Sequence, residues 1–223
     1  MIDLPDFSKV WDYENNFYLS CDISRVSKIL AHYELFKMIN GLPGAIVECG
    51  VFKGTGLIKF ATFRELFGGP FSRKIIGFDM FGKFPETNYE EDKKYRDYLI
   101  GAEGAGDQSI SKEQLFEILH NKGIEKNIEL VEGDIIKTVP EYIKKNPHLK
   151  LSLVNLDTDI YEPAVTILEY LWPQIVKGGV LVLDDYATFP GETKAVDEYF
   201  KEKNVKIQKF SFAKTPCYII KEE

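Results

Sequence analysis

The stretch Ala45-Ile-Val-Glu-Cys-Gly-Val-Phe-Lys-Gly-Thr-Gly56 decides the fold class. It starts with an apolar run, Ala45–Cys49, and continues directly into a glycine-rich turn. Near-continuous apolarity is typical of a strand that is buried on both faces of a parallel sheet. Glycines let the backbone approach a ligand closely, and a helix that starts at such a turn presents unpaired N–H groups. The stretch therefore predicts a strand–turn–helix unit that binds a ligand, although a tight turn without a ligand has the same pattern.

Similar apolar runs recur along the chain and alternate with helical stretches. The further runs are Lys74–Asp79, Ile128–Gly133, Leu151–Asp157 and Val180–Asp184. The helical stretches between the runs are Leu57–Leu66, Lys112–Lys122, Val139–Asn146 and Pro163–Ile175. This alternation predicts parallel strands joined by right-handed crossovers. Two strand-like runs at the end, Val205–Phe210 and Cys217–Ile220, predict an antiparallel hairpin. We expect a Rossmann-like α/β fold with a mostly parallel seven-stranded sheet, a C-terminal hairpin and helices on both faces.

The chain length of 223 residues suits one domain, which we expect to span residues 1–223. Apolar residues recur at helical spacing from Ser24 to Asn40, and residues 1–40 are expected to form a helical extension. Residues 81–111 form a long connection that is rich in Gly, Asp, Glu and Tyr and includes the run Gly101–Gly106. This connection could be a lid that closes over a substrate, or a surface insertion.

Composition excludes several classes of protein. The net charge of −7 disfavours a nucleic-acid partner. The chain has no run of about 18 apolar residues, so neither a membrane span nor a membrane partner is expected. No signal peptide is visible, and Cys21, Cys49 and Cys217 form no Cys-x-x-Cys pair that would indicate zinc or a disulfide framework. These features predict a cytoplasmic protein.

The N-terminal extension is rich in aromatic residues: Phe7, Trp11, Tyr13, Phe17 and Tyr18. Such residues could shape an acceptor pocket, form a contact between subunits or pack into the core, which is their more common fate. Because the extension exceeds what the core fold needs, we expect a homodimer.

Acidic residues follow the first three predicted strands. Ligands bind outside the carboxyl ends of parallel strands, so these acids are candidate site residues. Glu48 precedes the glycine-rich turn and suits a cationic group, such as the amino group of a methionyl moiety. Asp79 could accept hydrogen bonds from ribose hydroxyls, as in NAD or S-adenosylmethionine (SAM) sites. Asp134 could meet an adenine, and a simple turn aspartate is an equal alternative.

Two clusters of aspartates follow the fourth and fifth predicted strands. Asp157 and Asp159 belong to one cluster, and Asp184 and Asp185 to the other. Four like charges in a partly buried cleft would repel one another, and a bound divalent cation would relieve this repulsion. Carboxylates suit hard ions such as Mg²⁺, Mn²⁺ or Ca²⁺. Any one of these aspartates could instead cap a helix or a turn, but the joint pattern indicates a metal site.

At these residues the chain resembles the macrocin O-methyltransferase family of class I methyltransferases. The resemblance extends from about residue 24 to 220. It is carried by the segments Leu42–Gly54, Gly77–Pro85, Leu156–Glu162, Gly178–Tyr186, Pro190-Gly191 and Ala195–Tyr199. The general methyltransferase pattern often has a glycine where this chain has Phe52. A bulky residue at this position resembles the pattern of this family.

The resemblance implies SAM as the methyl donor, a divalent metal, usually Mg²⁺, and a deoxysugar hydroxyl as the acceptor, often on a nucleotide or a natural product. By position it implies a SAM site at Glu48, Gly50, Val51, Gly54, Thr55, Asp79 and Asp134. It implies metal ligands at Asp157, Asp184 and Asp185. Asp157 and Asp159 are the implied catalytic residues, and Asp159 is either the base or a further ligand.

The chemistry explains why such residues are needed. A sugar hydroxyl is a poor nucleophile at neutral pH, metal coordination lowers the pKa of a bound oxygen, and a nearby carboxylate can take the proton. Three alternatives remain open: an N-methyltransferase acting on an amino sugar or other small amine, which would need less activation; an NAD(P)-dependent oxidoreductase; and a non-catalytic SAM- or nucleotide-binding protein. The absence of a compact Gly-x-Gly-x-x-Gly motif disfavours the oxidoreductase.

The histidines have no paired spacing, so surface or core roles are expected for His32, His120 and His148. Among the three, His120 is the least improbable active-site residue, because its predicted helix follows segment 81–111.

Overall fold

The central sheet has the topology that the sequence predicts. The computed structural model describes residues 2–101 and 106–223. Seven strands lie in the order β3-β2-β1-β4-β5-β7-β6, with the first five parallel and β7 and β6 antiparallel. Their bounds are β1 (Ala45–Cys49), β2 (Ile75–Asp79), β3 (Ile128–Glu132), β4 (Leu151–Leu156), β5 (Ile175–Leu183), β6 (Gln208–Lys209) and β7 (Cys217–Ile220). The seven-stranded α/β architecture and the terminal hairpin are confirmed.

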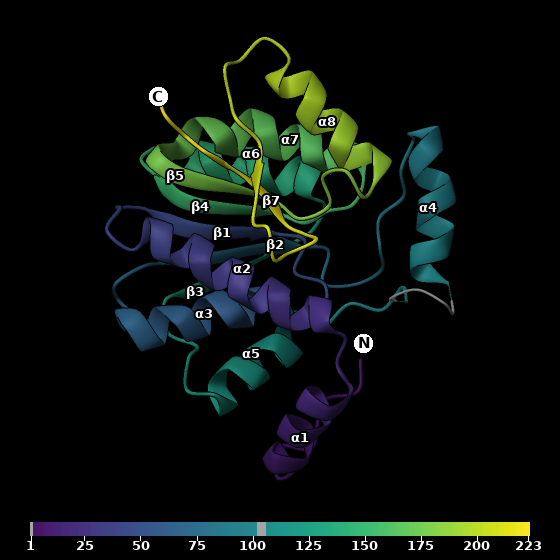
Figure 1. Ribbon diagram of the computed structural model, residues 1–223, viewed down its shortest axis with the longest axis vertical. Coiled ribbons are helices and arrows are strands. Elements are labelled where there is room, and N and C mark those ends of the chain that lie inside the picture. The colour runs from purple at the N-terminus through teal and green to yellow at the C-terminus, as the bar shows by residue number, and fades with distance from the viewer. Residues whose placement is uncertain (1, 102–105) are drawn as a thin grey trace.

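Helices cover both faces of the sheet (Figure 1). On one face lie α2 (Ile23–Ile39), α3 (Thr55–Phe67) and α5 (Lys112–Asn121), and on the other lie α6 (Ile135–Lys145), α7 (Tyr161–Leu171) and α8 (Pro190–Phe200). Strand side chains alternate between the two faces. Ile46 and Leu153 are buried with residues of α2, α3 and α5, whereas Val47 and Val154 are buried with residues of α6, α7 and α8. Two apolar cores therefore hold the sheet rigid from both sides.

The strand register brings the carboxyl ends of β1, β4 and β5 into line. Cys49 pairs with Leu156, and Leu156 pairs with Leu183. The ladder continues one residue further, because the Asp157 amide donates to the Cys49 carbonyl at 3.0 Å and the Asp184 amide to the Leu156 carbonyl at 3.0 Å. The strand order also switches here, because β2 and β3 lie on one side of β1, whereas β4 and β5 lie on the other. Such a switch point is where open α/β sheets bind ligands.

Backbone strain gathers at the same edge. Phe52, Phe81, Asp159 and Ala187 have φ values of 49°, 48°, 61° and 64°, which side chains other than glycine rarely adopt. Each follows a different parallel strand: β1, β2, β4 or β5. Residues in such conformations persist only where the surrounding structure enforces them, and they concentrate at functional sites.

Several element boundaries differ from the sequence prediction. Helix α6 begins at Ile135 rather than Val139, because the Asp134 side chain caps its first turn and Pro140 is accommodated inside the helix. The helix predicted over Pro163–Ile175 ends earlier, at Leu171, and a short 3₁₀ turn, η1 (Trp172–Gln174), follows it. Pro173 lacks the N–H that would continue the α-helix. Strand β5 then starts at Ile175 rather than Val180, with a register shift opposite Leu151 and Leu153.

Helices α8 and α4, and helix α1 near the N-terminus, were not predicted individually. Helix α8 begins with a proline and buries Ala195, Val196 and Phe200. Helix α4 (Glu90–Ile100) lies within segment 81–111 and is so highly charged that it carries little apolar periodicity. It lies beyond the carboxyl edge of the sheet (Figure 1). Residues 102–105 of the glycine-rich run lie outside the described residues, and the lid remains a prediction.

Helix α1 (Val10–Ser20) belongs to the predicted helical extension and stands apart from the two layers (Figure 1). It buries none of its residues within the described chain. Trp11 is 76% exposed and Tyr18 is 73% exposed, so the core-packing alternative for these aromatic residues is wrong for this chain on its own. No helix among the described residues has the length and apolarity to span a bilayer.

Candidate active site

A cavity of about 920 Å³ opens at the carboxyl edge of the sheet. The first turns of α2 line it, together with the loops after β1, β2, β4 and β5. The predicted site residues that line it are Glu48, Gly50, Val51, Thr55, Asp79, Asp134, Asp157, Asp159, Asp184 and Asp185. Gly54 does not line it. Gly54 instead precedes α3 with a φ of 80°, and a Cβ at this position would lie 2.8 Å from Leu115.

Glu48 is buried beneath the glycine-rich turn. Its side chain is 1% exposed, and burial raises the pKa of its carboxyl to about 8. Asn155 donates to Oε1 at 3.3 Å, while Oε2 has no partner among the described residues. A Cβ at position 56 would lie 1.8 Å from Oε1, so Gly56 is needed for the turn to pass over this carboxyl. The site therefore holds an acid with an unused acceptor, which suits a cationic ligand group.

Asp79 organises the turn from the neighbouring strand. Its carboxylate accepts hydrogen bonds from the amides of Val51 at 2.8 Å, Phe52 at 2.9 Å and Phe81 at 2.6 Å. Burial raises the pKa of this carboxyl despite those bonds. Asp79 thus fastens the loops after β1 and β2 to each other, and its predicted contact with a ribose stays a prediction.

Asp134 has the local role that the sequence left open. Its side chain accepts from the Ile136 amide at 3.1 Å and lies 3.3 Å from the Lys137 amine. It therefore caps α6 as well as lining the cavity. Neither contact prevents a ligand from binding there, and its contact with adenine stays a prediction.

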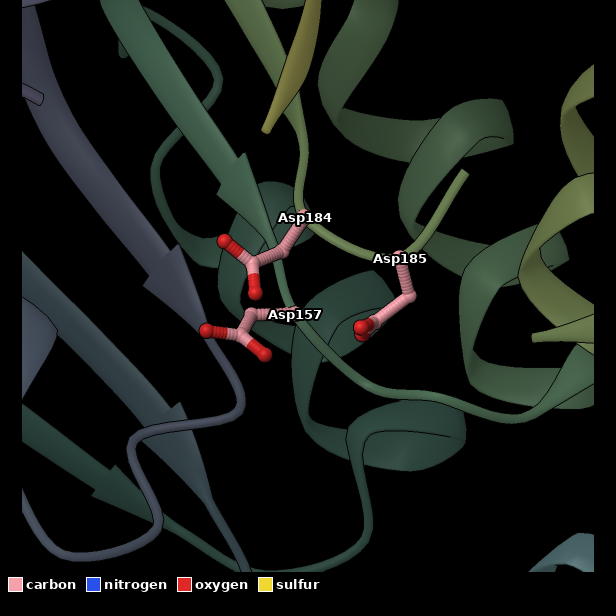
Figure 2. Close-up of side chains that lie close together, drawn as sticks. All are labelled: Asp157, Asp184 and Asp185. Carbon is pink, nitrogen blue, oxygen red and sulfur yellow. The ribbon is translucent and has the colours of Figure 1, made fainter. Parts of the chain in front are cut away.

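Asp157, Asp184 and Asp185 converge at the ends of β4 and β5 (Figure 2). One oxygen of each carboxylate lies within 4.8 Å of the others. Burial and then the Asp184 charge raise the pKa of Asp157, and burial and then the Asp159 charge raise the pKa of Asp185. Asp184 Oδ1 and Asp185 Oδ2 are buried and have no hydrogen-bond partner among the described residues. The predicted cluster is thus assembled, with unsatisfied acceptors inside it.

Asp159 lies beside the cluster in a left-handed conformation, with a φ of 61°. Its carboxyl lies close to that of Asp185. Burial, followed by the charge of Asp184, raises the pKa of Asp159 to about 6. A carboxyl with this pKa is mostly ionised at neutral pH and can accept a proton.

Three residues at the site were missed by sequence reasoning. Lys28 of α2 places its Nζ 2.5 Å from Asp184 Oδ2. His32 lies one turn further along the same helix, 1% exposed, with Nε2 3.9 Å from Asp184 Oδ1. Glu192 of α8 is fully buried and accepts a hydrogen bond from the Asp185 amide at 3.0 Å.

Only part of this set could be inferred from local sequence. Lys28 and His32 are four residues apart, so they share one face of a helix, and this spacing was a usable signal. His120 is not part of the cavity lining, because its side chain is 78% exposed and lies 3.7 Å from Glu125.

The acidic cluster fits a hard divalent cation. Its donors are carboxylate oxygens, which Mg²⁺ and Ca²⁺ prefer, and two of them are buried without partners among the described residues. Buried carboxylates without partners are costly, so the geometry favours either protonation or a bound cation. Lys28 offsets part of the negative charge from one side.

A family model describes most of this chain. The model of macrocin-O-methyltransferase (TylF) matches residues 25–218. Among curated proteins, a tetracenomycin 4'-O-methyltransferase of Streptomyces olivaceus, which acts at a dimethoxy-rhamnosyl group by its name, is 27% identical over 151 residues. That match covers 67% of this chain and 56% of the relative. The chain therefore spans a little over half the length of the curated relatives it first matches, at 56% and 59%.

Solved structures show the same fold. The calicheamicin methyltransferase CalS11 superposes with a TM-score of 0.77 at 27% identity, over 92% of this chain and 83% of that one. A second structure of CalS11, described as a TDP-rhamnose 3'-O-methyltransferase, superposes with a TM-score of 0.68 at 26% identity. This match covers 95% of this chain and 86% of that one.

Proposed function

The chain belongs to the macrocin-O-methyltransferase family, and we propose that it is a SAM-dependent, metal-assisted O-methyltransferase acting on a sugar hydroxyl. The acceptor class is a deoxysugar, carried either by a nucleotide or by a glycosylated natural product. The observation that carries this proposal is the convergence of Asp157, Asp184 and Asp185 in the same cavity as Glu48 and the glycine-rich turn. Donor and acceptor can therefore meet in one cavity, as the alignment of a methyl transfer requires.

The donor would bind over β1 and β2. Glu48 offers an unused carboxyl oxygen for the methionyl amino group. Gly50 and Gly56 let the turn lie close against the Asp157 carbonyl and the Glu48 carboxyl, and both glycines line the cavity. Asp79 holds the turn in shape from below. Val51, Thr55 and Asp134 complete the proposed SAM site along the cavity wall.

The acceptor would bind over β4 and β5. Asp157, Asp184 and Asp185 would hold one divalent cation, with Mg²⁺ as the proposed ion. When bound, this ion supplies Lewis acidity that lowers the pKa of a hydroxyl. Asp159 is the proposed base: it lies at the edge of the cluster, lines the cavity and has a pKa of about 6, so it can take the hydroxyl proton at neutral pH. Asp157 follows β4, the strand that pairs with β1 of the proposed donor site, and it would orient the hydroxyl.

The test is an assay of the purified protein with SAM, Mg²⁺ and a panel of nucleotide deoxysugars, including TDP-rhamnose. The expected product gains the mass of one methyl group on a sugar oxygen. Amino sugars belong in the same panel, because the O-methyl proposal fails if only amines are methylated. A parallel assay after exhaustive chelation tests the metal, since full activity without a divalent ion would contradict metal assistance.

A further inference from the structure

The charged helix α4 is fastened to the site by one buried carboxylate. Asp92 is 1% exposed although it lies in a helix whose neighbouring side chains face solvent. Its Oδ2 accepts a hydrogen bond from the Tyr161 amide at 2.8 Å. Its carboxylate also lies against the backbone of Gly191, whose amide favours the ionised form. Tyr161 begins α7 and Gly191 is the second residue of α8. One side chain thus lies at the amino ends of two helices, where unpaired N–H groups and the helix dipole favour an anion.

Neither helix has a cap of its own. The residues that precede them, Ile160 and Phe189, are apolar and make no side-chain capping bond. The junction is also closely packed. A Cβ at position 191 would lie 2.1 Å and 2.5 Å from the two Asp92 oxygens and 2.5 Å from the Tyr161 nitrogen. Gly191 is therefore required for α4, α7 and α8 to meet at this carboxylate.

Further contacts join the same elements. Glu162 of α7 accepts hydrogen bonds from Thr87 Oγ1 at 2.9 Å and from the Asn88 amide at 2.7 Å. Arg96 of α4 donates to the Pro85 carbonyl at 3.0 Å, in the part of segment 81–111 that lines the cavity. Helix α4 thus contacts the cavity wall through Arg96, and the amino ends of α7 and α8 through Asp92.

The two helices that Asp92 caps start directly after the proposed catalytic loops. Tyr161 is two residues from Asp159, whose left-handed backbone needs outside support. Gly191 lies at the start of α8, directly after the loop that contains Asp184 and Asp185, which we call, with the loop of Asp157 and Asp159, the two acidic loops. On the basis of the proposed function, we infer that Asp92 is a positioning residue for methyl transfer. By capping α7 and α8 together, it holds the two acidic loops at their working separation and makes that separation depend on docked α4.

The first test compares Asp92→Asn with Asp97→Asn, the same change at an exposed position of the same helix. Asp92→Asn is expected to lower kcat roughly 10- to 100-fold, with KM for SAM changed less than about twofold, because small displacements of reacting groups are costly. Hydrogen–deuterium exchange should become faster at the amides of Tyr161 and Gly191 and stay unchanged in β1–β3. Asp97→Asn should match the wild type. Unchanged kcat, or exchange that rises throughout the protein, would overturn the positioning role.

A second test does not depend on one variant. Gly191→Ala forces a methyl group into the Asp92 carboxylate and should lower kcat in the same way. Asp92→Ala removes the carboxylate that this methyl group would meet. Because Asp92→Ala and Gly191→Ala break one junction, the double variant should be about as slow as the slower of these two single variants. Losses that multiply would overturn the inference. A wild type without methyltransferase activity would refute the proposed function. The exchange measurement needs no substrate, so its pattern would still decide whether Asp92 anchors these loops.

Discussion

At the scale of single residues, the buried acids of this site differ in how many hydrogen bonds their oxygens accept. The Asp79 oxygens accept hydrogen bonds from three amides, whereas Glu48 keeps one oxygen without a partner among the described residues. A buried carboxyl of that kind prefers to be neutral until a cation arrives. The methionyl amino group of SAM would be such a cation, so ligand binding and proton release should be linked at Glu48.

Glu48 should make the stability of the free protein fall as pH rises. Its pKa is raised from 4.5 to about 8, so between these values the folded state holds a proton that the unfolded chain has lost. The stabilising effect is complete below about pH 4.5 and is lost as pH rises through about 8. Glu48→Gln should flatten the fall in Tm between about pH 5 and 8, as measured by thermal denaturation. The exposed change Glu117→Gln is the control, and an equal slope in Glu48→Gln and the wild type would contradict the linkage.

Asp184 and Asp159 should separate metal binding from turnover. Asp184→Asn removes a proposed ligand and should weaken the affinity for Mg²⁺ or Mn²⁺ while leaving that for SAM largely intact, as measured by calorimetry. Asp159→Asn should leave metal affinity nearer to that of the wild type and slow turnover by roughly 10²- to 10⁴-fold, the usual contribution of a positioned base. If Asp159→Asn loses metal binding as completely as Asp184→Asn, Asp159 is a ligand rather than the base.

At the scale of elements, β1 and the turn after it were predictable because their signals are local. The apolar run and the glycines that follow it encode a buried strand and a close-approach turn without reference to the rest of the chain. The start of β5 was not predictable, because the register shift beside Leu151 depends on how β4 and β5 meet. Helix α4 carries few apolar residues, and the buried residue that anchors it is an aspartate. Periodicity of apolar residues cannot detect a helix that is held by a buried charge.

The change Gly50→Ala tests how closely the chain after β1 approaches the chain after β4. Its φ is 91°, and a Cβ would lie 1.6 Å from the Asp157 carbonyl oxygen, which is backbone and cannot move aside cheaply. Gly50→Ala should therefore destabilise the protein by about 3 kcal/mol or more and abolish SAM binding. Gly41→Ala is the matched control, because a Cβ there meets nothing within 4 Å. Equal denaturation midpoints for the two variants would show that the loops separate easily.

At the scale of the whole molecule, the acidic cluster was predictable because parallel strands deliver their ends to one edge of the sheet. Asp157, Asp184 and Asp185 needed only the strand assignments to be placed together. Lys28 and Glu192 reach the same point from α2 and α8, which lie on opposite faces of the sheet. The spacing of Lys28 and His32 shows that they share one helix face, but which strand end that face reaches depends on how the helix packs on the sheet, and local sequence does not encode this packing.

The N-terminal helix raises the question of what covers it. Helix α1 has 11 residues and buries none of them within the described chain, whereas isolated helices shorter than about 12–15 residues are marginal in water. Its exposed side chains include Trp11, Tyr18 and Leu19, which is 84% exposed. Burial of these side chains against a second copy of the chain would stabilise both the helix and the pair, so we predict a homodimer in which α1 lies at the interface.

Light scattering of the purified protein should therefore report twice the mass of one chain. The triple change of Trp11, Tyr18 and Leu19 to Ala should shift it toward the monomer, because it removes the three most exposed large apolar side chains of α1. Glu14→Ala, on the same exposed helix, is the matched control and should leave the dimer intact. A wild type that stays monomeric at working concentration would remove the prediction. A triple variant that stays dimeric would place the interface elsewhere and leave α1 without a second chain to cover it.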